Sequence, residues 1–314
     1  MTPWARLRER GVLGINARNI AFTLGENPRH LYPLVDDKLR TKGLCKAAGI
    51  AVADVLATAD NHAAVEGLAD TLEGRSDFVL KPARGAMGNG ILVLGEAFEG
   101  GWLDAHDRPV KAAELRYHAE SVISGLYALG GQPDVAFAEE RLFVTEAFDP
   151  IVYRGVPDIR VIVYRGVPVM AMTRLPTRRS GGKANLHQGA VGAGIDLESG
   201  RTTHAMIGTR SVQDHPDTGQ AIVGFPIPCF DEALATALLA TDQTGLGYVG
   251  ADIVVDRTRG PMILELNARP GLAIQLANRS GLRSRLEAIR TRTAAGLDFE
   301  DRLALGRALA RGAT

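Results

Sequence analysis

The sequence has few cysteines and no long apolar run. Its two cysteines, Cys45 and Cys229, lie far apart without the paired spacing of a disulfide framework or a zinc site, and its seven histidines show no ligand spacing either. No apolar stretch approaches the roughly 20 residues that cross a bilayer, and the first residues lack the apolar core of a signal peptide. We therefore expect a soluble protein of the reducing cytoplasm without membrane insertion.

Neither sign of charge is in excess. The 314 residues include 36 Lys and Arg against 36 Asp and Glu, so no bulk field attracts a polyanion, and we expect no nucleic-acid partner. The hydrophobic content of 46% and charged content of 23% are typical of a globular protein. The length allows two modest domains or one large domain.

The motifs of covalent catalysis are also missing. The sequence has no GxSxG elbow and no zinc motif, and nothing in it argues for a Cys–His pair. No side chain presents itself as a covalent nucleophile. Any catalysis would then work by positioning the substrates and neutralising their charge.

What the sequence does contain is a strand that carries an acid and an amide. In Met262–Asn267, apolar residues surround Glu265 and Asn267, which are two apart and so share one face of a strand. A second apolar strand carries Asp252, and the short turn at 257–260 predicts an antiparallel hairpin that brings Asp252 near the other two. Three such oxygen ligands suit Mg²⁺. The competing interpretation is that these acids cap strand ends or pair with Arg269.

A glycine-rich turn follows the strand Phe78–Pro82. Lys81 ends that strand, and the turn at 85–90 has the glycine order GxxGxG, contributed by Gly85, Gly88 and Gly90. This is neither a dinucleotide fingerprint nor a P-loop. It suits a flap whose backbone N–H groups cover a phosphate chain beside the lysine. The competing interpretation is a flexible hairpin with a solvated lysine, which would have the same sequence pattern.

Further along, charged side chains gather around a second hairpin and the loop after it. Asp158 and Arg160 share a strand face, where an intrastrand ion pair is the competing interpretation. The segment from 174 to 185 then supplies cations and an amide suited to a transferring phosphoryl group, although a solvated basic loop would look similar; they are Arg174, Arg178, Arg179, Lys183 and Asn185.

The pattern along the chain predicts an arm and an α+β body of two lobes rather than a parallel doubly wound sheet. We expect an arm at 1–35, a first lobe at 36–138 and a second lobe at 139–314. The expected helices are 36–48, 61–72, 110–130, 231–243 (capped by Asp231) and the segment after 271. The expected strands are 78–82, 91–94, 136–144, 158–164, 167–174, 248–255 and 262–267, with a loop at 180–194.

Six short sequence motifs, taken in order, resemble those of the ATP-grasp superfamily, and within it those of the alpha-L-glutamate ligase-like proteins related to the ribosomal-protein glutamate ligases. The motifs are DKL at 37–39, FVLKP at 78–82, DIRV at 158–161, KANLHQGA at 183–190, ADIVVD at 251–256 and ELNARPG at 265–271. They extend over about three quarters of the chain, and NLHQGA and ELNARPG are the specific ones.

The resemblance implies a fold in which two α+β lobes with antiparallel sheets clamp ATP. It also implies roles by motif match. ATP would be contacted by Lys38, Lys81, the flap glycines Gly85, Gly88 and Gly90, the adenine hinge Glu139, Glu140, Arg141 and Leu142, and Asp158. The catalytic residues would be Arg160, which neutralises charge on the acyl-phosphate, and Lys183 and Asn185, which hold phosphates. Mg²⁺, or Mn²⁺ in its place, would be held by Asp252, Glu265 and Asn267, and the acceptor pocket would be bordered by Arg269 and Gly271. Which hinge glutamate serves adenine is open.

The family reaction implied is ATP-dependent ligation of a carboxylate to an amine through an acyl-phosphate, such as addition of glutamate or another amino acid to a peptide or small amine. The alternatives are an ATP-binding regulatory or assembly module without turnover, and an ATP-grasp phosphotransferase. Lys38 stands so early that the usual N-terminal Rossmann-like domain is expected to be lacking. The substrate pocket would then be completed by the arm, the C-terminal helices, a second subunit of a homo-oligomer or a partner protein.

Overall fold

A computed structural model describes residues 3–85, 88–128, 130–292 and 296–312 and has two antiparallel sheets, in which successive side chains of each strand point to opposite faces. The chain divides into two compact units. The smaller unit comprises 37–39 and 53–142, and the larger unit comprises 1–36, 40–52 and 143–314. Among the described residues, no helix is both long and apolar enough to cross a membrane.

The smaller unit is built on a sheet that runs β1–β6–β2–β3–β4–β5 in the described part of the chain. Its strands are β1 (Val55–Ala59), β2 (Phe78–Pro82), β3 (Leu92–Phe98), β4 (Gly101–Asp104), β5 (Pro109–Lys111) and β6 (Ala136–Glu140). Every neighbouring pair is antiparallel.

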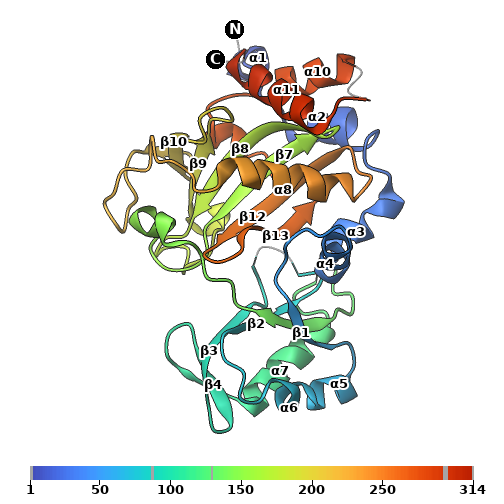
Figure 1. Ribbon diagram of the computed structural model, residues 1–314, viewed down its shortest axis with the longest axis vertical. Helices are drawn as coiled ribbons and strands as arrows, with labels where there is room; N and C mark the ends of the chain where they lie inside the picture. The colour runs from blue at the N-terminus through green and yellow to red at the C-terminus, as the bar shows by residue number, and fades with distance from the viewer. Residues whose placement is uncertain (1–2, 86–87, 129, 293–295, 313–314) are drawn as a thin grey trace. The chain divides into compact units, whose positions relative to one another are not determined.

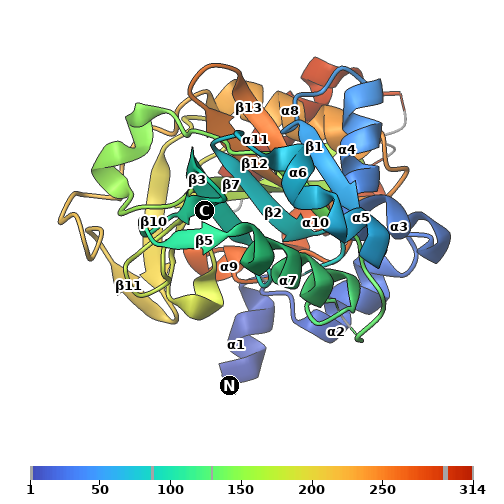
Figure 2. The same cartoon turned by 90° about the horizontal axis from the view of Figure 1, so that it is seen from below.

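Three helices cover one face of that sheet, namely α5 (His62–Glu66), α6 (Leu68–Leu72) and α7 (Ala112–Ile123) (Figures 1 and 2). Phe78 and Leu80 of β2 point into the same core as Leu115 and Val122 of α7. The alternate residue Lys81 is buried as well, so β2 has no solvent-facing side at its end. This is why a lysine can be held in a fixed place there.

The larger unit holds a sheet ordered β11–β10–β9–β8–β7–β12–β13 within the described residues. Its strands are β7 (Asp158–Tyr164), β8 (Val167–Leu175), β9 (Val191–Ile195), β10 (Thr202–Ile207), β11 (Arg210–Val212), β12 (Tyr248–Asp256) and β13 (Gly260–Asn267). All neighbours are again antiparallel.

Both faces of this sheet are buried. Odd-numbered residues of β7, such as Val161, enter one core together with Leu234 of α8 (Phe230–Asp242), the helix that lies across the sheet in Figure 1. Even-numbered residues, such as Ile162 and Tyr164, enter a second core with the N-terminal arm and the C-terminal helices. The strands therefore read as nearly continuous apolar runs.

The remaining helical pieces belong to the arm, to loops or to the C-terminal part. The arm has α1 (Pro3–Glu9), α2 (Ile15–Arg18), the π-helical η1 (Asn19–Thr23), η2 (Arg29–Leu31) and α3 (Pro33–Asp36). Then come α4 (Lys38–Ala47), η3 (Glu146–Ile151), η4 (Leu186–Gln188), α9 (Ile274–Ala277), α10 (Arg283–Thr291) and α11 (Phe299–Arg311).

Several expected elements differ in detail from the structure. The helix expected at 61–72 is two short helices that meet at Gly67, and the one expected at 110–130 ends at Ile123. The expected loop 180–194 contains η4 and most of β9. Asp231 is not the N-cap of α8. The N-cap is Cys229, which has a φ of 50° and lies two residues earlier in the sequence, so Asp231 lies within the first turn of the helix.

The unit boundaries also lie apart from the sequence-based domain limits 1–35, 36–138 and 139–314. Residues 40–52 group with the larger unit because Cys45, Ile50 and Val52 join its core. The expected limit at 138–139 falls inside β6, whereas the chain returns to the larger unit after Leu142.

Candidate functional site

The charged side chains singled out in the larger unit lie on one face of its sheet. Along β7, Asp158 and Arg160 share the face of Ile162, and along β12, Asp252 shares the face of Tyr248. Asp252 is directly opposite Arg160 in the register, and Asp158 is directly opposite Arg174 of β8. The apolar part of the face is covered by the arm and the C-terminal helices, and the strands continue beyond it as a polar cluster.

A one-residue bulge sets the register of the hairpin that carries the acids. Asp252 pairs with Glu265, while the next residue, Ile253, pairs with Ile263, so Leu264 is the extra residue of β13. Without that extra residue, Asp252 would pair with Leu264, and Glu265 would pair with the neighbour of Asp252 on β12. The bulge thus places the two carboxylates opposite each other.

The cluster is held by arginine–carboxylate pairs that run between strands. Arg160 donates from Nε and Nη2 to the two oxygens of Asp252, both at 2.6 Å. Arg174 donates to Asp158 at 2.6 and 2.5 Å and also reaches Asp252 Oδ2 at 2.8 Å. The intrastrand pair between Asp158 and Arg160 is therefore not what forms, because each finds its partner across the sheet.

Glu265 and Asn267 complete the group. The amide Nδ2 of Asn267 lies 3.4 Å from Asp252 Oδ2 and 3.3 Å from Glu265 Oε1, and Glu265 Oε1 is 4.0 Å from Arg160 Nη2. The side chain of Asp252 is fully buried, whereas that of Glu265 is 32% exposed. The structure thus brings together the three residues predicted as metal ligands, with Glu265 at the accessible side.

Burial and the two guanidinium groups separate the pKa values of the two aspartates. Burial raises the pKa of Asp158 to about 6, with Arg174 opposing and the negative charge of Asp252 adding to the increase. Burial also acts to raise the pKa of Asp252, but Arg160 and Arg174 outweigh it and hold that pKa below its usual range. Burial lowers the pKa of Arg174, and the carboxylates of Asp158 and Asp252 outweigh this, so the net change is upward. Asp252 is therefore the more acidic of the two aspartates and is ionised at neutral pH.

The donor set fits a hard cation by its chemistry. Carboxylate and amide oxygens are the ligands of Mg²⁺ in proteins. Asp252 and Glu265 present carboxylates from two adjacent strands, whereas Asn267 turns its amide Nδ2 toward them, so its Oδ1 would serve a metal only after the amide rotates. Within the described residues, no group of three or more His, Cys, Asp or Glu side chains is placed to hold a metal. A metal here would rest on two acids and one amide, and Asp252 would have to share its oxygens with the arginines.

The loop after β8 carries the other residues predicted to meet phosphate. Asn185 begins η4 and accepts a hydrogen bond from the backbone N–H of His187 through Oδ1 (2.9 Å). Gly189 ends η4 with a φ of 104°, which only glycine adopts without strain, and Arg179 packs where its Cβ would lie. Lys183 is exposed and makes no ion pair in the described part of the chain.

The turn that follows β13 is adjacent to the arginines. A Cβ at Gly271 would lie 3.9 Å from Arg160 Nη1, so this glycine borders the cluster. Arg269 points elsewhere: it lies 3.7 Å from Asp36 and over the ring of Tyr32, so the competing pairing of the acids with Arg269 does not occur.

The N-terminal arm holds that turn in place, which the sequence did not reveal. Asn27 donates to the carbonyls of Tyr248 (2.8 Å) and Ala268 (3.0 Å) and accepts from the N–H of Tyr248 (2.9 Å). Buried Arg18 donates to the carbonyl of Pro270 at 2.5 Å. Gln275 accepts a hydrogen bond from the N–H of Leu13 through Oε1 and donates one from Nε2 to the carbonyl of Leu13.

The predicted lysines Lys38 and Lys81 and the hinge glutamates lie in the smaller unit. Lys81 and Glu139 form a buried ion pair, and Lys38 donates from Nζ to the carbonyl of Gly85 at 2.6 Å. Glu140 instead accepts from the N–H of Asp54 at 2.9 Å. The two hinge glutamates thus have different surroundings, Glu139 facing a lysine and Glu140 closing a backbone contact.

The rest of the hinge and flap is only partly described. Arg141 pairs with Asp77 at 3.2 Å, and Leu142 is buried. Gly88 and Gly90 have positive φ values of 75° and 72°, as expected for a tight glycine turn. Residues 86 and 87 of the predicted flap lie outside the described residues.

Arg174 is the site residue whose role sequence reasoning did not assign. It was expected only as one cation of a basic loop, yet it joins Asp158 to Asp252. The hairpin around Arg165 and Gly166 signals that the end of β8 lies near the start of β7, but its register alone would place Thr173 opposite Asp158.

A family model described as sugar-transfer associated ATP-grasp matches residues 17–291. No curated protein matches the chain. Solved structures that are similar include the ATP-grasp ligase PsnB complexed with precursor peptide PsnA2 and AMPPNP, with 17% identity, a TM-score of 0.44, 84% of this chain covered and 60% of that one. D-alanine–D-alanine ligase from Bacillus anthracis complexed with ATP has 15% identity, a TM-score of 0.42 and coverage of 90% and 68%. The enzyme from Coxiella burnetii has 18% identity, a TM-score of 0.41 and coverage of 89% and 58%. The chain spans 60 to 64% of the length of the PsnB chains.

Proposed function

The chain belongs to the sugar-transfer associated ATP-grasp family and has the ATP-grasp fold, and from that premise we propose that it is an ATP- and Mg²⁺-dependent ligase that joins a carboxylate to an amine. The observation that carries the proposal is the cluster of Asp252, Glu265 and Asn267 with two guanidinium groups on one sheet face. Such a set has metal ligands and phosphate-neutralising cations side by side.

ATP and Mg²⁺ are bound by two different sets of residues. Lys38 and Lys81 contact the phosphates of ATP, with the flap glycines Gly85, Gly88 and Gly90 covering them and the segment Glu139–Leu142 taking the adenine. Mg²⁺, held by Asp252, Glu265 and Asn267, would supply charge neutralisation on the phosphates when bound.

The reaction follows from the equipment. A carboxylate oxygen of one substrate attacks the γ-phosphorus, the bond to ADP breaks, and an acyl-phosphate forms. The amine of the second substrate then attacks the acyl carbon, the C–O bond breaks, phosphate leaves and the nitrogen loses a proton. Arg160 neutralises the negative charge that develops on the acyl-phosphate, Lys183 and Asn185 hold the phosphates, and Asp158 orders Arg174 beside Arg160.

We assign an amino acid such as glutamate as one partner and a peptide or small amine as the other, as in the alpha-L-glutamate ligase-like proteins, with Arg269 and Gly271 at the acceptor pocket. Gly271 supports this because it borders Arg160. Three further predictions belong to this proposal. Mn²⁺ can replace Mg²⁺, a second copy of the chain or a partner protein completes the pocket, and the protein is cytoplasmic.

The test is release of ADP and phosphate from ATP with a panel of carboxylates, each with and without amines. Release that requires one carboxylate and one amine together supports ligation. Transfer of phosphate to a single hydroxyl acceptor would replace the proposal with a phosphotransferase. Nucleotide binding without turnover under every pairing would replace it with a binding module.

A further inference from the structure

The N-terminal arm exposes an unusual amount of apolar surface for its length. Leu7, Ile15, Ile20 and Leu24 are 41%, 63%, 72% and 56% exposed. The arm buries its other side, since Phe22 and Leu13 are in the core. A protein that kept this surface in water would gain nothing from apolar residues at these positions.

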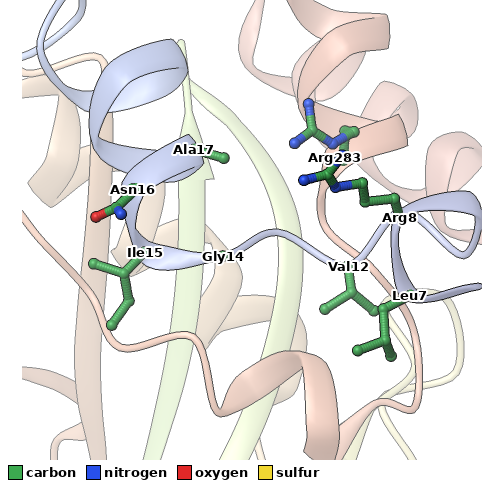
Figure 3. A pocket seen from close by; sticks show the side chains of 8 residues that line it. All are labelled: Leu7, Arg8, Val12, Gly14, Ile15, Asn16, Ala17 and Arg283. Atoms are coloured by element: carbon green, nitrogen blue, oxygen red, sulfur yellow. The ribbon is translucent and has the colours of Figure 1, made fainter. Parts of the chain in front are cut away.

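A groove lies between the start of the arm and α10. It has a volume of about 600 Å³, within the range of small-molecule sites, and is open to solvent on one side. Figure 3 shows Leu7, Val12 and Ile15 projecting from successive parts of the arm along it. Its walls are therefore mainly apolar.

Two guanidinium groups lie together at one end of the groove. Arg8 comes from α1 and Arg283 from the first turn of α10, and Figure 3 shows their side chains beside each other. Arg283 has a partly exposed partner, Glu287, at 3.3 Å, while Arg8 makes no ion pair within the described residues. Two cations with a single acid, Glu287, at the end of an apolar groove leave a net positive charge that complements an anionic head group carrying a hydrocarbon chain.

The whole arm has the same character. Residues 3–24 contain four arginines and one glutamate, although the complete chain is neutral. Arg6, Arg8 and Arg10 are all exposed. A helical segment with exposed apolar residues and arginines is the pattern of peptides that lie in the interface of an anionic membrane.

We propose that residues 5–24 with Arg283 form a surface that docks on an anionic phospholipid bilayer, the groove taking the first part of one acyl chain and Arg8 and Arg283 its phosphate. A second copy of the chain fits less well, because each copy brings an arm with four arginines and one glutamate, so the two facing surfaces would carry the same net charge. A dissolved amphiphile would fill the groove but leave Ile20 and Leu24, which do not line it, in water. The proposal is independent of the ATP chemistry.

The test is flotation of the full chain with phosphatidylcholine vesicles that contain phosphatidylglycerol, and with phosphatidylcholine vesicles alone. We expect binding to the anionic vesicles that weakens with salt. The double change R8Q/R283Q lowers the partition coefficient about 30-fold, since each arginine near a charged surface contributes about fivefold. The double change L7S/I15S lowers it by at least about tenfold, because two apolar side chains no longer enter the interface.

Matched controls use exposed residues elsewhere. R75Q/R210Q removes two exposed arginines, and Leu239→Ser removes a 46%-exposed leucine of α8. Both should bind like the wild type, and all variants should keep its melting temperature. Equal binding to neutral vesicles, no binding at all, or the same loss in the controls would overturn the proposal. So would a dimer that forms through this surface, or capture of monomeric dodecyl phosphate without vesicle binding.

Discussion

Arg174 is the single residue on which the charged cluster most depends. It donates to both oxygens of Asp158 and to Asp252, and the three side chains are almost completely buried. Removing the cation leaves Asp158 as a buried carboxylate without a counterion. Removal of one partner of a buried ion pair destabilises the fold more than replacement of both partners, because it leaves a buried charge uncompensated.

We therefore expect Arg174→Met to lower the free energy of unfolding by about 3 to 5 kcal/mol. Urea denaturation followed by circular dichroism measures it. Arg210→Met, at an exposed site, should stay within about 0.5 kcal/mol of the wild type. Adding Asp158→Asn to Arg174→Met should restore part of the loss, and an additive double variant would contradict the coupling.

His215 makes stability depend on pH outside the site. Its Nε2 is 3.0 Å from the carbonyl of Pro176, while the N–H groups of Asp217 and Thr218 point at Nδ1. The ring must therefore be neutral, with its proton on Nε2. Burial lowers its pKa below the ordinary value of 6.5, although the carbonyl and Asp217 oppose the change.

The unfolded chain then takes up a proton near pH 6.5 while the folded chain does not, so stability falls as the pH drops below 6.5. His215→Gln lacks this titration. We expect the advantage of the wild type over His215→Gln to be largest at pH 8 and to shrink toward pH 5. Chemical denaturation at both pH values checks this, and a constant difference would show that the ring titrates alike in both states.

At the scale of elements, the arm is fastened to the turn after β13 by a few buried hydrogen bonds. Asn27 alone serves three backbone groups, two of Tyr248 and one of Ala268. An alanine in its place would leave those groups buried without partners, at about 1 to 3 kcal/mol for an unsatisfied group.

Asn27→Ala should accordingly destabilise the chain by at least about 2 kcal/mol. It should also raise the rate of hydrogen exchange at the amides of Ala268, Arg269 and Gly271. Asn61→Ala, the loss of an exposed helix cap, is the control and should cost about 1 kcal/mol without affecting those amides. Unchanged exchange in Asn27→Ala would mean that the turn is rigid without the arm.

The sequence predicted regular elements well where a single pattern decides them. The strands around Leu80, Val161 and Ile253 have the expected places because apolar runs between turn residues permit little else. The convergence of Asp252 with Glu265 and Asn267 also followed from a short turn and strand alternation.

The details of the site depend on features that leave no local signal. A bulge at Leu264 sets the register of Glu265, and another register shift between Ile162 and Val163 brings Arg174 rather than Thr173 opposite Asp158. Such one-residue insertions depend on packing against both faces of the sheet. The contacts of Asn27 with residues more than 200 positions away are equally invisible in a local pattern.

At the scale of the whole molecule, the two units carry different parts of the proposed chemistry. The smaller unit holds the lysines, Lys38 and Lys81, at fixed positions. The larger unit holds the acids and arginines on one sheet face. The family match begins at residue 17, within the arm, and extends to 291, so it includes both sets.

The most direct test of the central claim is ADP formation by Glu265→Gln, measured at saturating ATP and Mg²⁺ with the carboxylate and amine that support wild-type turnover. The change keeps the shape of the side chain and removes the accessible negative charge of the predicted metal site. We expect turnover to fall at least about 100-fold, with ATP affinity changed by less than about tenfold. Glu232→Gln, at an exposed position of α8, should behave like the wild type. Wild-type turnover by Glu265→Gln would contradict the assignment of Asp252, Glu265 and Asn267 as the metal site.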